Sequence, residues 1–320
     1  MRVVFMGSAE LSCRCFEALV ASGRYDVAAV VTQPDRPKGR NLEVSPCAAK
    51  AHAVRAGIPV LTPPNVNSPD SLAALQALSP DLIVVVAYGQ ILRRPILDLP
   101  PRGCINVHFS LLPKYRGAAP IQWAIARGES VTGVTVMFMN ERMDAGDIIA
   151  RQVEPIHDND TAGSLHDRLA VAGASLLVRS LPVLADGTFT RTAQVEAEAT
   201  LAPKIHKQDG EIDWTRPATA IYDNVRAFNP WPGCFCRLPD GTVLRVFAVR
   251  REDGAGTPGT VIECDRQGPL VAAGSGAVRL VEVQPEGGRR MPATAYVRGH
   301  PMGVGSHLVG VHAPLKAGNP

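Results

Sequence analysis

The apolar run LIVVV at residues 82–86, within the segment DLIVVVAYG, most constrains the fold of this chain. A strand without polar alternation is typical of a parallel sheet that is covered by helices on both faces. RVVFMG at residues 2–7 and DVAAVVT at residues 26–32 are further short apolar strands. Helical patterns at residues 9–23 and 47–57 separate these strands. This strand–helix alternation predicts an α/β domain with an open, mostly parallel, twisted sheet.

From about residue 208 the pattern changes to short β-like runs separated by glycine-containing turns, among them TVLRVFAVR, GTVIEC and AVRLVEVQPEG. Several short strands with regular turn signals predict a small barrel or sandwich. Residues 188–206 lack strong periodicity and are interpreted as a linker. We therefore expect a first domain at residues 1–187 and a small C-terminal β-barrel domain at residues 207–312.

The charge of the chain is unevenly distributed. Of the 320 residues, residues 201–320 hold 14 Lys and Arg against 11 Asp and Glu, which accounts for the whole net charge of +3. Residues 287–320 contain no acidic residue. A basic face fits an anionic partner such as RNA. A solvated surface with a slight charge bias explains the same count, so both interpretations stay open.

Seven cysteines, an odd number, favour reduced thiols over a disulfide framework. The two C-x-C pairs favour buried apolar thiols over a metal site, because no Cys/His cluster completes either pair. The N-terminus MRVVFMGSAE lacks the apolar stretch of a signal peptide, and no apolar run approaches the length of a membrane span. We expect a cytoplasmic chain that binds no metal and no membrane.

The stretch GCINVHFSLLPKYRG at residues 103–117 places polar residues in an apolar strand. Asn106 and His108 are two residues apart, so they share one face of the strand. Asp144 lies in the turn DAGD between two further strands. An Asn amide can donate to an oxyanion, a His can move a proton, and an Asp can orient an imidazole. By itself each residue also fits an ordinary structural role.

Taken together, these residues predict a catalytic site at the carboxyl end of the sheet, where ligands bind in open α/β folds. No Ser or Cys is obviously placed as a nucleophile beside His108, which favours direct transfer between two bound substrates. The first βα turn reads GSAELS, with one glycine, and no P-loop occurs in the chain. The sequence therefore does not predict a nucleotide site.

INVHFSLLPKYRGAAPIQWAI and TGVTVMFMNERMDAGDII resemble the catalytic core of the folate-dependent formyltransferases. These enzymes carry an Asn-x-His, a Ser-Leu-Leu-Pro and an Asp-x-Gly-x-x-Ile motif in this order. The resemblance implies a Rossmann-like catalytic domain followed by an OB-like barrel. It also implies that Asn106, His108 and Asp144 are catalytic, that 10-formyltetrahydrofolate is the formyl donor, and that no metal is needed.

Two segments are similar to the part of the family that binds folate: the Ser-Leu-Leu-Pro turn and VVVAYGQIL at residues 84–92. The folate-binding residues that the resemblance implies are Ser110, Leu111, Leu112, Pro113, Tyr88, Gly89, Gln90, Ile91 and Leu92.

The acceptor is suggested by the loop TQPDRPKGR at residues 32–40 and by GEIDWTRPATAIYDNVRAFNPWPG at residues 210–233. Both resemble the branch of the family that formylates methionine esterified to initiator tRNA. This implies that initiator methionyl-tRNA is the partner and that the C-terminal domain binds it. We also expect the enzyme to be a monomer. The expected tRNA contacts are Arg40, Lys204 and Lys207, and Trp231 is expected to anchor the core rather than stack on a base.

Two alternatives stay open. One is a formyltransferase that acts on an amino sugar nucleotide, because such enzymes can carry an Ile-Asp-Trp segment and a related second domain. The other is a non-enzymatic RNA-binding protein on the same scaffold. The intact set of Asn106, His108 and Asp144 speaks against the second.

Overall fold

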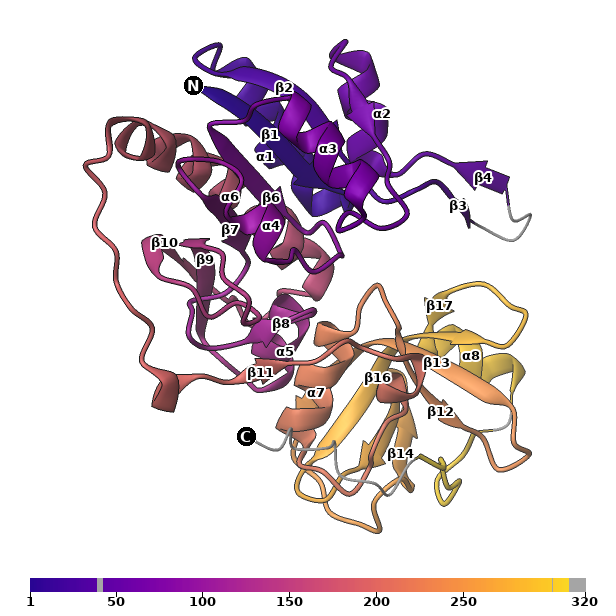
Figure 1. Ribbon diagram of the computed structural model, residues 1–320. Coiled ribbons are helices and arrows are strands. Elements are labelled where there is room, and N and C mark those ends of the chain that lie inside the picture. Colours follow the sequence, from indigo (N-terminus) through magenta and orange to yellow (C-terminus); the bar gives the residue numbers. More distant parts are fainter. Residues whose placement is uncertain (39–42, 301, 311–320) are drawn as a thin grey trace. The chain divides into compact units, whose positions relative to one another are not determined.

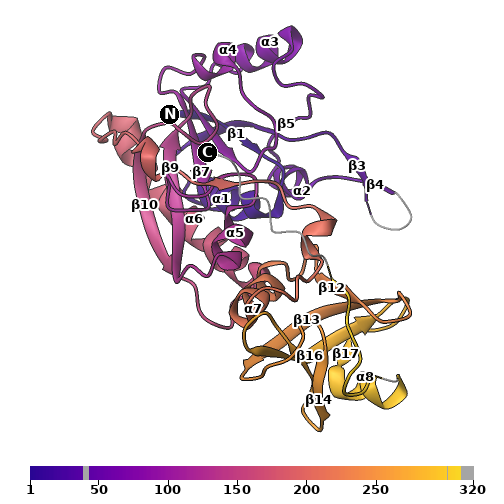
Figure 2. The same cartoon turned by 90° about the horizontal axis from the view of Figure 1, so that it is seen from below.

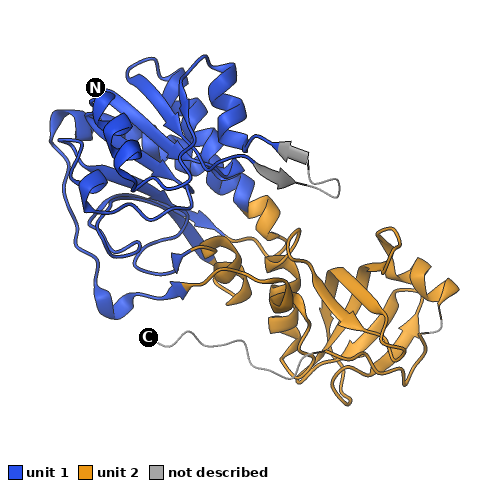
Figure 3. Ribbon diagram, turned by 45° about the vertical axis from the view of Figure 1, so that its right-hand side comes forward, with its two compact units in different colours: residues 1–117, 131–155, 166–201 blue, residues 118–130, 156–165, 202–320 orange. Residues whose placement is uncertain are grey.

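The computed structural model describes residues 1–38, 43–300 and 302–310. The chain forms two compact units that are interleaved along the sequence (Figure 3). Unit 1 comprises residues 1–117, 131–155 and 166–201, and unit 2 comprises residues 118–130, 156–165 and 202–320. Two short segments from the middle of the chain therefore fold with the C-terminal unit.

Unit 1 is built on a seven-stranded sheet in the order β10-β9-β7-β6-β1-β2-β5 (Figure 1). The strands from β7 to β5 are parallel, and β9 and β10 add an antiparallel edge, so the predicted open and mostly parallel sheet is confirmed. The strand order reverses between β1 and β6, which makes their carboxyl ends a topological switch point. The strands are β1 Arg2–Gly7, β2 Asp26–Val31, β5 Val60–Leu61, β6 Leu82–Val86, β7 Cys104–His108, β9 Val131–Phe138 and β10 Ile148–Pro155.

Helices cover both faces of this sheet. Alternate residues of β1 point to opposite faces, so each face presents apolar side chains against which a helix packs. Val4 and Met6 pack with Leu75 of α3, whereas the ring of Phe5 contacts Phe16 of α1 at 5.5 Å between centroids. β6 is buried along its whole length, as its uninterrupted apolar sequence predicts. The helices of this part of the chain are α1 Glu10–Ala21, α2 Ala48–Arg55, α3 Pro69–Ala77, α4 Arg94–Leu97 and α6 Ala162–Asp186.

The long helix α6 begins after Thr161, whose Oγ1 accepts a hydrogen bond from the backbone N–H of Ser164. By length and composition, α6 is the one helix within the described residues that could cross a membrane, and 56% of its most apolar window is buried inside the protein. A Cβ on Gly173 would lie 2.9 Å from the ring of Phe109, so glycine permits α6 to approach the end of β7. Packing on the sheet thus accounts for the apolar face of α6.

Unit 2 holds an antiparallel sheet in the order β12-β13-β16-β15-β14, with β17 on β16, and helices α7 and α8 pack against it (Figure 2). The elements of unit 2 are α5 Pro120–Ala126, η2 Lys207–Gly210, α7 Ala218–Ala227, β12 Cys234–Arg237, β13 Val243–Glu252, β14 Val261–Asp265, β15 Gly268–Ala272, β16 Ala277–Pro285, β17 Met291–Pro292 and α8 Ala293–Gly299. The shorter elements elsewhere are β3 Arg36–Lys38, β4 Glu43–Ser45, β8 Arg116–Gly117, η1 Glu196–Glu198 and β11 Leu201–Ala202.

The two edge strands of unit 2, β12 and β14, do not pair with each other. The C-terminal segment lies between them instead: Arg237 and Val309 exchange two backbone hydrogen bonds of 2.8 Å, and the N–H of Val261 donates to the carbonyl of Ser306. The small antiparallel domain expected from the sequence is confirmed. Its barrel character depends on this bridging segment rather than on a closed strand ladder.

One positive charge of unit 2 is internal. Arg279 on β16 is buried and donates to the carboxylates of Glu252, Glu263 and Asp265. A buried guanidinium requires such partners, because an unpaired charge is costly to remove from water. Arg279 therefore links β16 to β13 and β14 and is not part of a basic surface.

Five of the seven thiols are inaccessible. Burial raises the pKa of the Cys15 and Cys104 thiols to about 12, which leaves almost no thiolate at neutral pH. Cys47 and Cys264 are partly exposed. The buried thiols, which include both predicted C-x-C pairs, are Cys13, Cys15, Cys104, Cys234 and Cys236.

We expect a thiol reagent such as DTNB, at about pH 8, to modify at most Cys47 and Cys264 in the folded protein, because only these two of the seven thiols are partly exposed. The same reagent should titrate all seven thiols in urea. Rapid modification of a third thiol in the folded protein would contradict the packing described for unit 1 and unit 2.

Candidate active site

β7 ends at the carboxyl edge of the sheet and carries two polar side chains there. Asn106 and His108 are paired with Met137 and Thr135 of the antiparallel strand β9. His108 is buried, with 6% of its surface exposed, and Asn106 is half-buried. The two side chains lie on one face of β7, as their spacing requires.

Asp144 lies in the turn between β9 and β10. It adopts φ of +50°, a left-handed conformation that Asp tolerates better than most residues. Two positions later, a Cβ on Gly146 would lie 1.8 Å from the carbonyl oxygen of Phe138. Only glycine can make this close approach, so the Asp-x-Gly pattern is a geometric requirement of the turn.

The fold brings the three predicted catalytic residues together. The Asn106 amide donates to Asp144 Oδ1 at 3.4 Å, and His108 Nδ1 lies 3.7 Å from Asp144 Oδ2. The backbone N–H of Gly117 donates to the same Oδ2 at 2.9 Å. Asp144 is therefore held by a short backbone hydrogen bond, while its contacts with Asn106 and His108 are longer.

The orientation of the His108 ring is fixed by the turn that follows β7. His108 Nε2 lies 2.9 Å from the carbonyl oxygen of Tyr115. A carbonyl oxygen only accepts hydrogen bonds, so Nε2 carries the proton in this contact. Nδ1, which faces Asp144, is the nitrogen left to exchange a proton. Sequence reasoning missed this role of the Tyr-Arg-Gly turn, since nothing in the pattern shows which way its carbonyl groups point.

In the predicted folate turn, Ser110–Pro113, the polar groups of Ser110 and the side chain of Leu112 make contacts within the protein. The Ser110 hydroxyl donates to the Lys114 carbonyl at 2.6 Å, and the Ser110 carbonyl accepts from the Thr135 hydroxyl. Leu112 packs in a small buried cluster with Met137 and Ile148. Pro113 is buried as well, and Leu111 is half-buried. The turn is thus fixed by the hydrogen bonds of Ser110 and by the packing of Leu112.

The second predicted folate segment, residues 88–92, follows β6. Gln90 accepts from the Val66 N–H and donates to the Pro63 carbonyl, so its amide fixes the loop. Ile91 is 77% exposed, whereas Leu92 and Tyr88 belong to the core cluster. Gly89 has φ of +89°.

The carbonyl of Tyr88 accepts hydrogen bonds from Ser8 Oγ and from Gln33 Nε2. These bonds join the loops that follow β1, β2 and β6. The Tyr88 hydroxyl is buried and has no hydrogen-bond partner among the described residues, and burial raises its pKa to about 12. Tyr88 is therefore a neutral donor at the switch point of the sheet.

Of the predicted tRNA contacts, Lys204 and Lys207 are exposed in unit 2, and Arg40 lies outside the described residues. The expectation that Trp231 anchors the core is wrong, because 51% of its surface is exposed. Prolines flank Trp231 on both sides, and Phe228, three residues earlier, is the fully buried aromatic residue of this segment. An exposed, flat side chain is available for contact with a partner.

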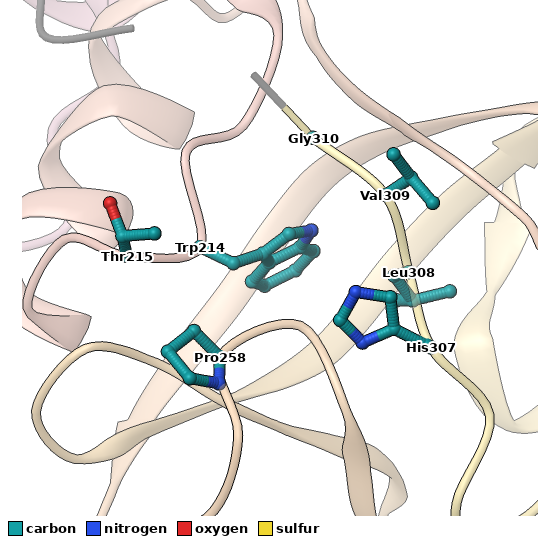
Figure 4. Close-up of a pocket in the computed structure, with 7 residues that line it drawn as sticks. All are labelled: Trp214, Thr215, Pro258, His307, Leu308, Val309 and Gly310. Carbon is teal, nitrogen blue, oxygen red and sulfur yellow. The ribbon is translucent and has the colours of Figure 1, made fainter. Parts of the chain in front are cut away.

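Two cavities are lined by residues other than the predicted site residues. A pocket in unit 2 is surrounded by Trp214, Pro258 and His307 and has a volume of about 20 Å³, close to the size of one water molecule (Figure 4). A mostly apolar cavity of about 280 Å³ in unit 1 includes Val31 and Leu61, at the ends of β2 and β5. Within the described part of the chain, no group of three or more His, Cys, Asp or Glu side chains could hold a metal ion.

A Rossmann-like sheet with Asn, His and Asp at its carboxyl edge, followed by a small antiparallel domain, defines a group-transfer enzyme of the α/β class. The family model described as formyl transferase matches residues 1–181, and the model of its C-terminal domain matches residues 204–301. The chain therefore belongs to the formyl transferase family and is an enzyme.

Among its relatives are methionyl-tRNA formyltransferases. That of Citrifermentans bemidjiense is 46% identical over 308 residues, which cover 96% of each chain. That of Moorella thermoacetica is 47% identical over 310 residues, which cover 96% of this chain and 99% of the relative.

Solved structures support the fold. HypX from Aquifex aeolicus, solved in complex with tetrahydrofolic acid, matches with a TM-score of 0.62 and 19% identity, over 93% of this chain and 47% of HypX. WlaRD, a sugar 3N-formyl transferase, matches with a TM-score of 0.65 and 16% identity, over 89% of this chain and 97% of WlaRD.

Proposed function

We propose that this enzyme transfers the formyl group of 10-formyltetrahydrofolate to the α-amino group of methionine on initiator tRNA. The similarity to methionyl-tRNA formyltransferases over 96% of the chain carries this proposal, because it includes unit 2 as well as the catalytic unit. Translation initiation implies a cytoplasmic enzyme, and we expect it to act as a monomer.

The reaction joins the amine nitrogen to the formyl carbon and breaks the bond between that carbon and N10 of the folate. The amine loses one proton and N10 gains one, so the products are N-formylmethionyl-tRNA and tetrahydrofolate. Negative charge develops on the formyl oxygen when the carbon becomes tetrahedral. A catalyst for this step needs hydrogen-bond donors at that oxygen and a group that moves the proton.

Asn106 and His108 are the donors in this proposal. Because the Tyr115 carbonyl occupies His108 Nε2, the ring can offer only Nδ1 to the oxyanion, next to the Asn106 amide. Nδ1 donates only when the ring is an imidazolium, because Nε2 already carries a proton. Asp144, 3.7 Å from Nδ1, orients this ring and relays the proton that leaves the amine towards N10. The burial of His108 strengthens these interactions, since water screens them less.

In this proposal the folate binds beside these residues, between the Ser-Leu-Leu-Pro turn and the loop after β6. Two observations support this assignment. The Tyr88 hydroxyl is a buried donor without a partner among the described residues, and Leu112 of the turn packs in an apolar cluster with Met137 and Ile148. The polar and ring-shaped parts of a pterin suit a site that combines a donor with apolar surfaces.

The proposal is tested by formyl transfer from 10-formyltetrahydrofolate to two acceptors, charged initiator methionyl-tRNA and an amino sugar nucleotide. Transfer to the tRNA alone supports the proposal. Transfer to the sugar nucleotide alone would assign the enzyme to the other branch of its family. Uncharged initiator tRNA is the matched control, because it lacks the amine.

Lys204 and Lys207 are proposed to contact tRNA phosphates. We expect the double change Lys204→Ala and Lys207→Ala to raise the Kd for the tRNA by roughly tenfold at low salt. The slope of the logarithm of the binding constant against the logarithm of the salt concentration should become less steep by about two. The KM for the folate should not change, because phosphate contacts add affinity for the nucleic acid only. Binding titrations at several salt concentrations measure both effects; an unchanged salt slope would contradict the assignment.

A further inference from the structure

The segment from Thr192 to Thr200 lies within the region expected to be a linker. It is hydrogen-bonded next to the Asp144 turn and to the turn that follows β7. Thr192 and Ile148 exchange backbone hydrogen bonds of 2.8 and 2.9 Å just after the Asp144 turn. Thr200 Oγ1 accepts from the N–H of Tyr115 at 2.9 Å, and its carbonyl accepts from the next residue, Arg116. All of these residues belong to unit 1.

Gln194 lies in the middle of this segment and contacts the catalytic turn directly. Its Nε2 donates to the carbonyl oxygens of Asp144 and Gly146, both at 2.8 Å. Its Oε1 accepts from the guanidinium of Arg116, from Nε at 3.1 Å and from Nη2 at 2.8 Å. Both N–H groups and both lone pairs of the amide are therefore used.

Arg116 gives the amide of Gln194 a fixed position. The guanidinium is buried, and its Nη1 donates to both carboxylate oxygens of Glu196 at 3.0 and 3.1 Å. This hydrogen bond lowers the pKa of the Glu196 carboxyl, so the pair stays ionised at neutral pH. Arg116 also immediately precedes Gly117, whose N–H donates to the Asp144 carboxylate.

Asp144 is thus held at two points, at its carbonyl by Gln194 and at its carboxylate by Gly117. This support matters because the left-handed conformation of Asp144 is disfavoured for a residue with a side chain. We infer that Gln194 is a positioning residue, which holds the Asp144 turn in the geometry that catalysis requires. The inference rests on the proposed catalytic role of Asp144.

The test uses the full-length enzyme and three single variants. Gln194→Ala removes both hydrogen bonds to the turn, and Gln194→Glu keeps the size and the contact with Arg116 but cannot donate. We expect each to lower kcat by roughly 10- to 100-fold, because a displacement of about 1 Å at a catalytic group costs this much. The KM for folate and for tRNA should stay within about threefold, since neither substrate is bound by Gln194. The control is Gln76→Ala, an exposed position on α3.

A double-variant comparison separates positioning from a general structural role. If Gln194 acts through Asp144, adding Gln194→Ala to an Asp144→Asn enzyme should lower kcat by less than about twofold further. If Gln194 only stabilises the fold, its effect should be as large in this background as in the wild type.

Two results would overturn the inference: an unchanged kcat in Gln194→Ala, or full additivity with Asp144→Asn. A third result concerns the proposed function itself. If Asp144→Asn alone retains the wild-type rate, the catalytic assignment of Asp144 fails, and the role inferred for Gln194 fails with it. Tm measurements on every variant identify any loss of activity that is caused by unfolding.

Discussion

Replacing Asn106 with Ala should lower kcat for formyl transfer by about 10²–10³, the usual cost of losing one oxyanion donor. The Asn106 amide is half-buried, and in the structure it makes only a long 3.4 Å contact with Asp144. It is therefore free to turn to a stronger acceptor when negative charge develops. Because the interaction is strongest in the transition state, kcat should fall while the KM values change little.

Single-turnover measurements with saturating folate and methionyl-tRNA give this value directly. The isosteric change Asn106→Asp provides the matched control, because it preserves shape and removes the donor. Asp should be at least as harmful as Ala, since it also places a second carboxylate beside Asp144. An Asn106→Asp enzyme with near wild-type kcat would show that the amide does not donate to the reacting oxygen.

Gly146→Ala should be the most harmful change that touches neither substrate. The added Cβ would lie 1.8 Å from the carbonyl oxygen of Phe138, which is a backbone atom and cannot rotate away. Overpacking of this kind costs about 1–3 kcal/mol of stability, and more where the backbone must move. The Asp144 turn would be displaced, so we expect kcat to fall by at least about 100-fold.

Thermal unfolding and kcat measured on the same preparation test both parts of this expectation. Gly299→Ala is the control, because a Cβ at that position meets no atom within 4 Å. It should leave kcat unchanged and stability within about 0.5 kcal/mol. Normal activity in Gly146→Ala would mean that the turn can relax without moving Asp144.

Much of the catalytic geometry could be predicted from the sequence. Two polar residues at period 2 in an apolar strand must share a face, so the common direction of Asn106 and His108 followed from the pattern alone. The position of Asp144 beside them did not. It depends on the antiparallel pairing of β9 with β7 and on the conformation of the turn after β9.

The surroundings of the site could not be predicted. The Tyr115 carbonyl occupies Nε2 of His108 and leaves Nδ1 facing Asp144, and no sequence pattern encodes the direction of that carbonyl. Residues 188–206 were expected to be a linker because they lack periodicity. Segments held by individual side-chain hydrogen bonds, as at Gln194, have no periodicity to detect.

The sequence by itself indicated the class of fold, because uninterrupted apolar strands that alternate with helical patterns are typical of a parallel sheet covered by helices on both faces. It also predicted which residues, Asn106, His108 and Asp144, meet at the candidate site. The tertiary structure alone decided that residues 118–130 and 156–165 fold with the C-terminal unit and that Trp231 faces outward. The physical reason is the separation along the chain of the residues that interact. Periodicity reflects contacts between neighbours in the chain, whereas these features depend on contacts between residues far apart in it.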